Sequence, residues 1–286
     1  MLIKLNQRVH CENEYGKLEK VAVCSPAYMS ISAGINETQK YFADEKLKRS
    51  LAIEQHTQFI QILKDHGVDV VELAADRQKP EQVFTRDIGF TVGDTVFLAE
   101  MKCQVRKGEE EVLKEWLERE QIAYKQLTGS PIEGGDVLVH GKYVYIGLSD
   151  RTAPKAVAEL KGLLGSEYEL VPMPFKSCYL HLDCVFNILS DEDAIIYPEA
   201  FSENEYAILS QRYELITVSS QEQFSMGTNV LSIGNRTVLS LPCNKQLNRK
   251  LRLRGYKVVE IDFSEIIKSG GSFRCCSMPL KRLNEK

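Results

Sequence analysis

The chain has 286 residues, of which 43% are apolar and 27% are charged, and its formal net charge is −4. This composition predicts a globular protein with a large buried core and excludes a disordered chain. The sequence carries no basic stripe for nucleic acid and no polybasic membrane patch, so we expect neither kind of partner.

The amino-terminal residues contain no apolar run of signal-peptide length, and no stretch of about 18 apolar residues is present that would span a bilayer. We therefore expect a cytoplasmic protein. In that reducing compartment its eight cysteines should be thiols, most of them small buried hydrophobic residues.

Four segments share one local pattern, in which an apolar strand, a short turn rich in Gly, Asp or Asn, and a second apolar strand follow one another. β-Branched and aromatic residues alternate around these turns and predict β-hairpins. Helical apolar spacing and a further short strand follow each hairpin. The hairpins are FTRDIGFTVGDTVFLAE (84–100), IEGGDVLVHGKYVYIGL (132–148), LHLDCVFNILSDEDAIIYP (180–198) and GTNVLSIGNRTVLSLP (227–242), and the helices are GEEEVLKEWLERE, TAPKAVAELKGLL, NEYAILSQRY and NKQLNRKLRLRG.

Five chemically reactive or polar residues recur at nearly constant spacing. Asp87, Glu133, His181, Asn229 and Cys275 are separated by 46, 48, 48 and 46 residues. A period of this length predicts a repeated supersecondary unit, and we expect each of the five residues in the first strand of its unit.

The fifth unit is split across the two chain ends. Its first strand is the Cys275 segment, and it continues with KVAVCSP, a long helix near 42–66 and the strand VDVVEL. The predicted fold is therefore a five-bladed, pseudosymmetric α/β propeller of ββαβ units, a single domain over residues 1–286 whose termini share one blade.

Equivalent positions in such a ring face one pseudo-axis at the same end, so the five residues should form a central site. Buried groups of these types cost free energy unless they are paired, and packing alone does not explain them. A thiol, an imidazole and a carboxylate supply a nucleophile, a proton carrier and an orienting group. We expect Cys275 to attack, His181 to move protons and Glu133 to hold the imidazole.

The chain also places an excess of acid at these strand starts, where Asp87, Glu133, Asp136 and Asp183 occur. Several carboxylates in one cleft favour a cation, and the paired donors of a guanidinium match carboxylates well. The predicted substrate therefore carries a guanidinium group.

Four motifs in this order, FTRD, IEGGDVL, HLDCVF and RCCSMPL, resemble the guanidino-modifying enzymes of the pentein superfamily, which include dimethylarginine dimethylaminohydrolase, arginine deiminase and the amidinotransferases. The similarity covers nearly the whole chain. It implies a hydrolase that cleaves a C–N bond of a guanidino amino acid through a cysteine thiouronium intermediate. The expected product is citrulline, and no cofactor or metal is implied.

By this resemblance Cys275 is the nucleophile, and its neighbours Arg274 and Cys276 should point away from the site if the strand is regular. No lysine accompanies the thiol, which favours deprotonation assisted by the substrate. The resemblance assigns Asp87 to the guanidinium, and it assigns Arg106 and Arg151 to the substrate α-carboxylate. Asp183 and Asn229 are also expected to contact the substrate.

One difference from the motif of many dimethylargininases leaves the identity of the substrate undecided. Many dimethylargininases have a lysine two residues after the histidine, whereas this chain has Asp183, as arginine deiminase does. A second carboxylate would grip unsubstituted nitrogens and crowd N-methyl groups. Arginine deiminases resemble longer chains with an inserted helical subdomain, and the repeats leave no room for one. A dimethylargininase-like hydrolase is therefore preferred, with an arginine deiminase, an amidinotransferase and a non-catalytic guanidino-binding protein as alternatives.

Cys178, His181 and Cys184 have the spacing of metal ligands, but on a strand the two cysteines would point away from the histidine, so we expect no metal site. No glycine motif for a phosphate or dinucleotide occurs. Residues 26–42 are either a mobile lid over the site or an ordered surface loop. The sequence leaves a monomer and a homodimer open.

Overall fold

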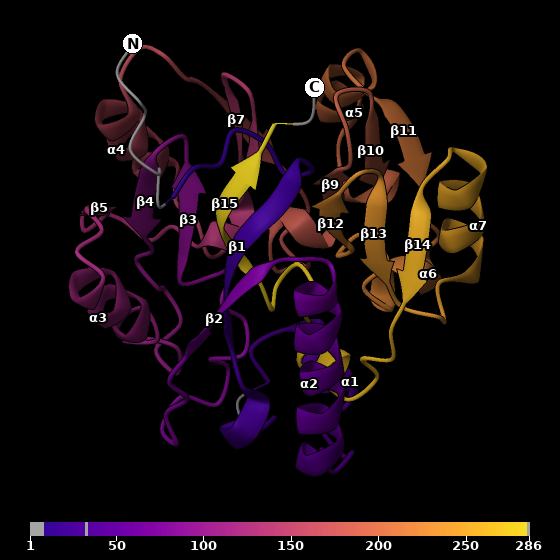
Figure 1. Cartoon of the computed structure of the whole chain (residues 1–286). Coiled ribbons are helices and arrows are strands. Elements are labelled where there is room, and N and C mark those ends of the chain that lie inside the picture. The colour runs from indigo at the N-terminus through magenta and orange to yellow at the C-terminus, as the bar shows by residue number, and fades with distance from the viewer. Residues whose placement is uncertain (1–8, 32–33, 285–286) are drawn as a thin grey trace.

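The structure is a computed structural model that describes residues 9–31 and 34–284. The strands in this part of the chain form five three-stranded sheets (Figure 1). The strands are β1 (Lys17–Cys24), β2 (Asp69–Leu73), β3 (Gly89–Val92), β4 (Thr95–Leu98), β5 (Tyr124–Gln126), β6 (Val137–His140), β7 (Tyr143–Leu148), β8 (Glu169–Pro174), β9 (Phe186–Ile188), β10 (Asp193–Ile196), β11 (Glu214–Thr217), β12 (Leu231–Gly234), β13 (Thr237–Ser240), β14 (Lys257–Glu260) and β15 (Met278–Leu283).

All five sheets have the same topology. The first strand pairs antiparallel with the second, and the second pairs parallel with the third after a helical crossover. The crossover helices are α2 (Arg49–Asp65), α3 (Glu111–Arg119), α4 (Pro154–Leu164), α5 (Glu203–Ser210) and α7 (Lys245–Leu253), and two short helices, α1 (Glu37–Tyr41) and α6 (Ser220–Phe224), lie outside this pattern. The four predicted hairpins and the helices that follow them are confirmed.

Turn chemistry explains why these hairpins form. Gly93 follows β3 with a φ of 54°, and Asn235 and Arg236 join β12 to β13 with φ angles of 49° and 50°. Such left-handed turns match the twist of paired strands, and glycine and asparagine adopt them at low cost. Buried apolar residues on both faces of most strands then fix the register.

The sheet at the chain ends confirms the predicted split unit. β1 pairs antiparallel with β15, so that Lys17 lies opposite Leu283, and it pairs parallel with β2. Figure 1 shows β15 (yellow) beside β1 (indigo). The predicted helix near 42–66 is wrong at its start. It begins only at Arg49, because Phe42 ends α1 and the Lys48 N–H donates to the Glu265 carboxylate at 2.8 Å.

The sheets contact one another in a closed cycle. β15 contacts β3, and a bridge joins Glu100 after β4 to Ile132 before β6. β6 contacts β9, and the Asn187 side chain of β9 donates to the Thr228 carbonyl before β12 at 2.8 Å. β12 in turn contacts β1. The connections that precede the first strands are thereby brought close together.

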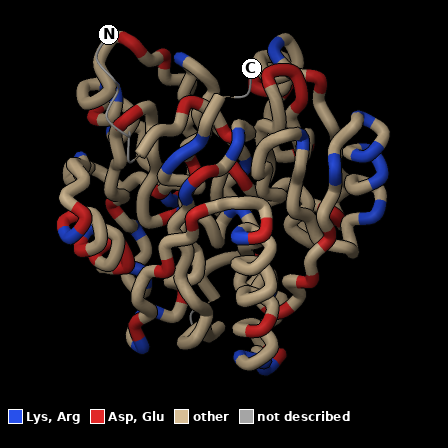
Figure 2. The backbone as a smooth tube through the Cα atoms, in the orientation of Figure 1, with Lys and Arg blue, Asp and Glu red and all other residues tan. Residues whose placement is uncertain are grey.

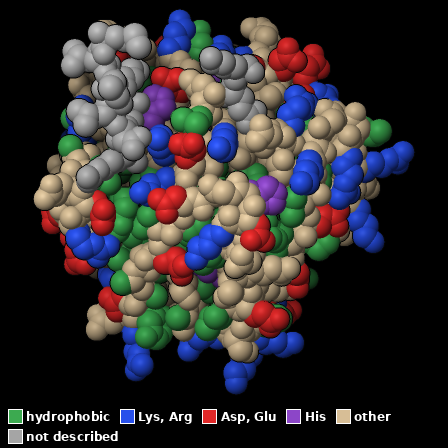
Figure 3. All heavy atoms as spheres, in the orientation of Figure 1, with side chains coloured by type: hydrophobic (Ala, Val, Ile, Leu, Met, Phe, Trp, Pro, Cys, Tyr) green, Lys and Arg blue, Asp and Glu red, His purple; other side chains and the backbone are tan. Residues whose placement is uncertain are grey.

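Acidic and basic side chains are interspersed over the face shown in Figure 3. Lys and Arg gather along α7 (Figure 2), a local basic cluster that differs from the expected absence of a basic stripe. No helix of residues 9–31 and 34–284 is long and apolar enough to cross a membrane.

Candidate active site

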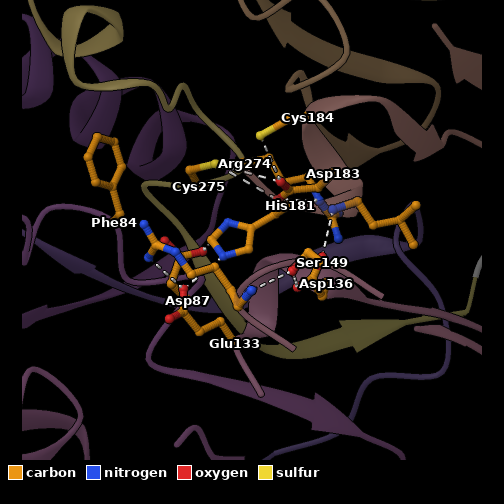
Figure 4. A network of polar contacts seen from close by, with 12 residues as sticks. Phe84, Asp87, Glu133, Asp136, Ser149, His181, Asp183, Cys184, Arg274 and Cys275 are labelled. Atoms are coloured by element: carbon orange, nitrogen blue, oxygen red, sulfur yellow. Dashed lines mark hydrogen bonds and ion pairs between the residues drawn. The ribbon is translucent and has the colours of Figure 1, made fainter. Parts of the chain in front are cut away.

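The five residues with nearly constant spacing lie in the connections before the first strands and not inside the strands. Asp87 and Asn229 lie two residues before β3 and β12, and His181 lies five residues before β9. Glu133 and His181 each lie directly before a 3-10 turn, η2 (Gly134–Asp136) and η3 (Leu182–Cys184) respectively. Turns free the side chains from the alternation of a strand, so neighbouring residues can face one site (Figure 4).

His181 is buried between two carboxylates. Its Nε2 lies 2.8 Å from Glu133 Oε2, and its Nδ1 lies 3.4 Å from Asp87 Oδ1. Burial alone would lower the pKa of His181, but the charges of Asp87, Glu133 and Asp136 raise that pKa to about 10. Burial would raise the pKa of Glu133, whereas the imidazole and two nearby arginines lower it to about 2. The pair is therefore an imidazolium and a carboxylate at neutral pH.

Cys275 lies on the other side of the site. Its Sγ accepts a hydrogen bond from Asn229 Nδ2 at 3.0 Å and lies 3.8 and 3.9 Å from the two carboxylate oxygens of Asp183. The side-chain Oδ1 of Asn229 accepts a hydrogen bond from the Cys275 backbone N–H at 3.0 Å, which fixes the orientation of the Asn229 amide. A contact with Cys184, burial and the Asp183 charge raise the pKa of Cys275 well above its ordinary value. These effects favour the neutral thiol of Cys275 over its thiolate.

Arg106 and Arg151, the two arginines predicted to bind the substrate α-carboxylate, also lie at the site. Arg106 donates from Nη1 to Asp87 Oδ2 at 2.6 Å and from Nε to Glu109 Oε2 at 2.9 Å, and it is buried. Arg151 Nη1 lies 3.4 Å from Glu133 Oε2. Arg106 is thus enclosed by carboxylates, whereas Arg151 lines a cavity at the rim of the site.

Glycines leave the room that these side chains fill. A Cβ on Gly135 would lie 2.7 Å from Nδ1 of His181 and 2.8 Å from Oδ1 of Asp87. A Cβ on Gly271 would lie 2.5 Å from the ring of Phe84. The absence of a Cβ at Gly271 therefore permits the close approach of Phe84 to the segment before Cys275.

Two small cavities adjoin the site under the segment that carries α1. They have volumes of about 150 and 130 Å³. Arg151 and Lys40 line the first, and Cys184 and Gly270 line the second, which is mainly apolar. Both are also lined by Asn36, Glu37, Cys178, Tyr179 and Leu180.

The α1 segment is tied to the site by polar contacts. Arg151 donates to the Ile35 carbonyl at 3.2 Å, and Asn36 Nδ2 donates to the Ser269 carbonyl at 2.9 Å. Residues 34–42 of the predicted lid therefore cover the site in an ordered conformation, and its motion stays a prediction. Residues 32–33 of the predicted lid lie outside the described residues.

One expectation that assumed a regular strand is wrong. Arg274 does not point away from the site, because its Nε lies 3.3 Å from Asp183 Oδ2. Cys184 also lies beside the site, with its Sγ 3.7 Å from Asp183 Oδ1, whereas Cys178 is exposed. Cys276 packs in a hydrophobic cluster. Arg274 and Cys184 lie at the site, although reasoning from the alternation of side chains along a strand did not place them there. The sequence did offer one indication, because Arg274 is adjacent to Cys275 and Cys184 is adjacent to Asp183.

The site offers one close group of metal-ligating atoms. Potential ligand atoms of Asp87, Glu133 and His181 lie within 4.8 Å of one another. Each of the two carboxylates, however, already pairs with the imidazole and with an arginine, Arg106 or Arg151. This pairing accounts for their proximity without an ion.

The five ββαβ sheets and a cysteine, a histidine and several carboxylates before their first strands define a guanidino-modifying enzyme of the pentein superfamily. The sequence model of the family described as "N,N dimethylarginine dimethylhydrolase, eukaryotic" matches residues 25–282, and the chain belongs to this family.

Individual relatives agree with this assignment. The chain is 47% identical over 279 residues to the uncharacterized protein YkgA of Bacillus subtilis (strain 168), covering 98% of this chain and 97% of the relative. It is 29% identical over 270 residues to the N(G),N(G)-dimethylarginine dimethylaminohydrolase of Mycobacterium tuberculosis (strain ATCC 25618 / H37Rv), covering 92% and 86%. The N-terminal domain of ArgZ, a cyanobacterial arginine dihydrolase, has the same fold, with a TM-score of 0.84 and 23% identity over 93% of this chain and 98% of the other.

Proposed function

We propose that the protein is a hydrolase that cleaves a C–N bond of a guanidino amino acid through a covalent intermediate on Cys275. The observation that carries the proposal is a buried thiol that shares one site with a His181–Glu133 pair and with the carboxylates of Asp87 and Asp183. A guanidinium between the two aspartates would have its carbon within reach of the thiol.

The protonation states fit the first step. When the positive guanidinium binds beside it, the thiol releases its proton to solvent and becomes a thiolate, because that charge offsets the carboxylates that raise the pKa of Cys275. The thiolate adds to the guanidinium carbon. His181, protonated at rest, gives its proton to the departing amine, and a thiouronium remains on Cys275.

The second step uses the same histidine as a base. Neutral His181 takes a proton from water, which attacks the thiouronium carbon, and the C–S bond breaks to release a ureido product and the thiol. Glu133 holds the imidazole throughout. Arg151 is the better placed arginine for a substrate α-carboxylate, because it lines a cavity of about 150 Å³, whereas Arg106 is enclosed.

We favour methylated arginine as the substrate, with citrulline and a methylamine as products, because the family and the M. tuberculosis relative act on dimethylarginine by name. A mainly apolar cavity beside Cys184 would accept N-methyl groups. Asp183 supports the second candidate, unsubstituted arginine, since its carboxylate suits free N–H donors.

The closed cycle of contacts between the five sheets supports our inference that the fold is a five-bladed propeller.

The test is the formation of ureido product from monomethylarginine, asymmetric dimethylarginine, arginine and agmatine, measured in parallel with the purified protein. Cys275→Ser should lower turnover by about 1,000-fold or more, because a hydroxyl is a far weaker nucleophile than a thiolate. Cys276→Ser is the matched control in the adjacent buried thiol and should retain turnover.

Each outcome has a distinct reading. Turnover of methylated arginines supports the first substrate, and turnover of arginine alone supports the second. Product from Cys275→Ser but not from Cys276→Ser would refute the assignment of the nucleophile. Binding of all four compounds without product would point to a guanidino-binding protein, and product only when an amine acceptor is added would point to amidinotransfer.

A further inference from the structure

A chain of buried charges leads away from the site behind Asp183. Arg274 is 1% exposed, and it lies between two carboxylates. Its Nη1 donates to Glu14 Oε2 at 2.7 Å, and its Nε lies 3.3 Å from Asp183 Oδ2. Within residues 9–31 and 34–284, Arg274 is the only cation at ion-pair distance from Asp183.

Glu14 is itself fixed from several sides. Its Oε1 accepts from the Val139 backbone N–H at 3.0 Å, and its Oε2 lies 3.5 Å from Arg86 Nη1. Burial would raise the pKa of Glu14, but Arg274 and Arg86 lower it to about 2, so it is a carboxylate over the working pH range. A buried charge that is held this firmly restricts the rotation of the guanidinium that pairs with it.

We propose that Arg274, anchored by Glu14, is a positioning residue that holds the Asp183 carboxylate toward Cys275 and the bound guanidinium. This inference rests on the proposed function and adds a residue to its machinery. Arg274 contacts neither the thiol nor the expected substrate position by a hydrogen bond, so its effect passes through Asp183.

The charge of Arg274 also has a chemical consequence for Asp183. A buried aspartate surrounded by other acids would take up a proton, and a neutral carboxyl grips a guanidinium weakly. Burial raises the pKa of Asp183, and the charge of Arg274 opposes that rise. The titratable and charged groups that face Asp183 are Arg274, Arg86, His181, Asp87, Cys184 and Cys275.

The test compares Arg274→Gln with Arg282→Gln. Arg282 is equally buried, but its guanidinium donates to the main-chain carbonyls of Gly16 and Ser232 at 2.7 and 2.9 Å. Arg274→Gln should raise KM about tenfold or more, because Asp183 loses the buried ion pair that holds its carboxylate. It should also move the acid limb of the kcat/KM profile to higher pH, because Asp183 then protonates more readily. Arg282→Gln should change neither quantity.

Two further variants separate charge from structure. Arg274→Lys keeps the charge but not the fork that joins Glu14 to Asp183, so it should restore the acid limb while KM stays raised. Glu14→Gln leaves the charge of Arg274 unopposed and should move the acid limb to lower pH. Equal behaviour of Arg274→Gln and Arg282→Gln, or shifts of the same sign in Arg274→Gln and Glu14→Gln, would overturn the proposal.

A binding measurement distinguishes this proposal from the proposed function. In a Cys275→Ser background, calorimetry should show that Arg274→Gln weakens the binding of the substrate found by turnover about tenfold. If the parent enzyme forms no ureido product from any guanidine, the proposed function fails. If the parent is active and Arg274→Gln leaves both binding and the pH profile unchanged, only the role of Arg274 fails.

Discussion

Single residues set how closely the groups of the site approach one another. Gly135, the middle residue of the 3-10 turn η2, has no Cβ at the point where His181 and Asp87 come together. The separation of 3.4 Å between Nδ1 and Oδ1 therefore depends on the absence of a methyl group. Among the described residues neither atom has a hydrogen-bond partner, so the ion pair between them is the polar contact that each one makes.

Gly135→Ala should reduce kcat/KM by about 100-fold, because displacement of a catalytic group by about 1 Å has an effect of that size. The added Cβ would lie 2.7 Å from the imidazole and must push it or Asp87 aside. Gly162→Ala is the matched control, since Gly162 lies in α4 with no atom within 4 Å of its ideal Cβ. The control should keep full turnover and melt slightly higher. Full activity of Gly135→Ala would contradict the proposed geometry.

The five evenly spaced residues could be found from the sequence because their spacing follows the repeat. They are Asp87, Glu133, His181, Asn229 and Cys275. Their exact placement before the strands was missed, since a period of 46 to 48 residues does not distinguish a strand from the turn that precedes it. The partners of Asp183 were missed for the same reason. Side-chain direction follows alternation only in a regular strand, and Arg274 lies in a turn.

At the scale of elements, α1 is the segment that closes the site from outside the repeat. Its N-cap is Asn36, whose side chain accepts from the Gln39 backbone N–H at 2.8 Å. The Gln39 side chain then donates to Glu81 at 2.9 Å, and Ser269 also donates to Glu81 at 3.0 Å. Because α1 has only five residues, these contacts, and not helix propensity, hold it in place.

Glu81 makes the anchorage of α1 dependent on pH. Burial raises the pKa of Glu81 from 4.5 to about 7. The folded state therefore binds more protons than the unfolded state between these values, so the contribution of Glu81 to stability is lost as the pH rises through them. The shift corresponds to about 3 kcal/mol at most.

Glu81→Gln should raise the melting temperature clearly at pH 8.5 and only slightly at pH 5.5, because an amide keeps the hydrogen bonds without the buried charge. Thermal melts at the two pH values check this prediction. Glu54→Gln, at an exposed position in α2, serves as the control with no such dependence. An equal change at both pH values would rule out Glu81 as the titrating group.

At the scale of the whole molecule, the cycle of sheets is closed by the pairing of β1 with β15. The main-chain contacts extend beyond the strands, because the His10 N–H donates to the Leu280 carbonyl at 2.8 Å and the Arg282 N–H donates to the His10 carbonyl at 2.7 Å. Closure buries the inner side chains of β15, including Met278 and Leu280. The sheet at the chain ends thus depends on residues from both ends of the sequence.

A circular permutant that begins at Ser166 and ends at Gly165, with a flexible linker between the original ends, should fold and retain turnover. The new ends lie in an exposed connection between α4 and β8, and the split unit becomes continuous. Removal of residues 278–286 should instead abolish the cooperative thermal transition, because β1 loses its antiparallel partner. A truncated protein that melts like the parent would refute this role of β15.

Because the first sheet combines β1 and β2 with β15, it is completed late in synthesis of the chain. Cys275, which we propose as the nucleophile, and β15, which completes the first sheet, leave the ribosome after all the other strands of the five sheets. Until then β1 exposes an unpaired edge, and the carboxylates and imidazole of the site have no thiol beside them. A chain that stops before Cys275 therefore lacks both the proposed nucleophile and β15. We expect such incomplete products to be inactive and to carry an unpaired edge of β1 that quality-control proteases and chaperones can recognise.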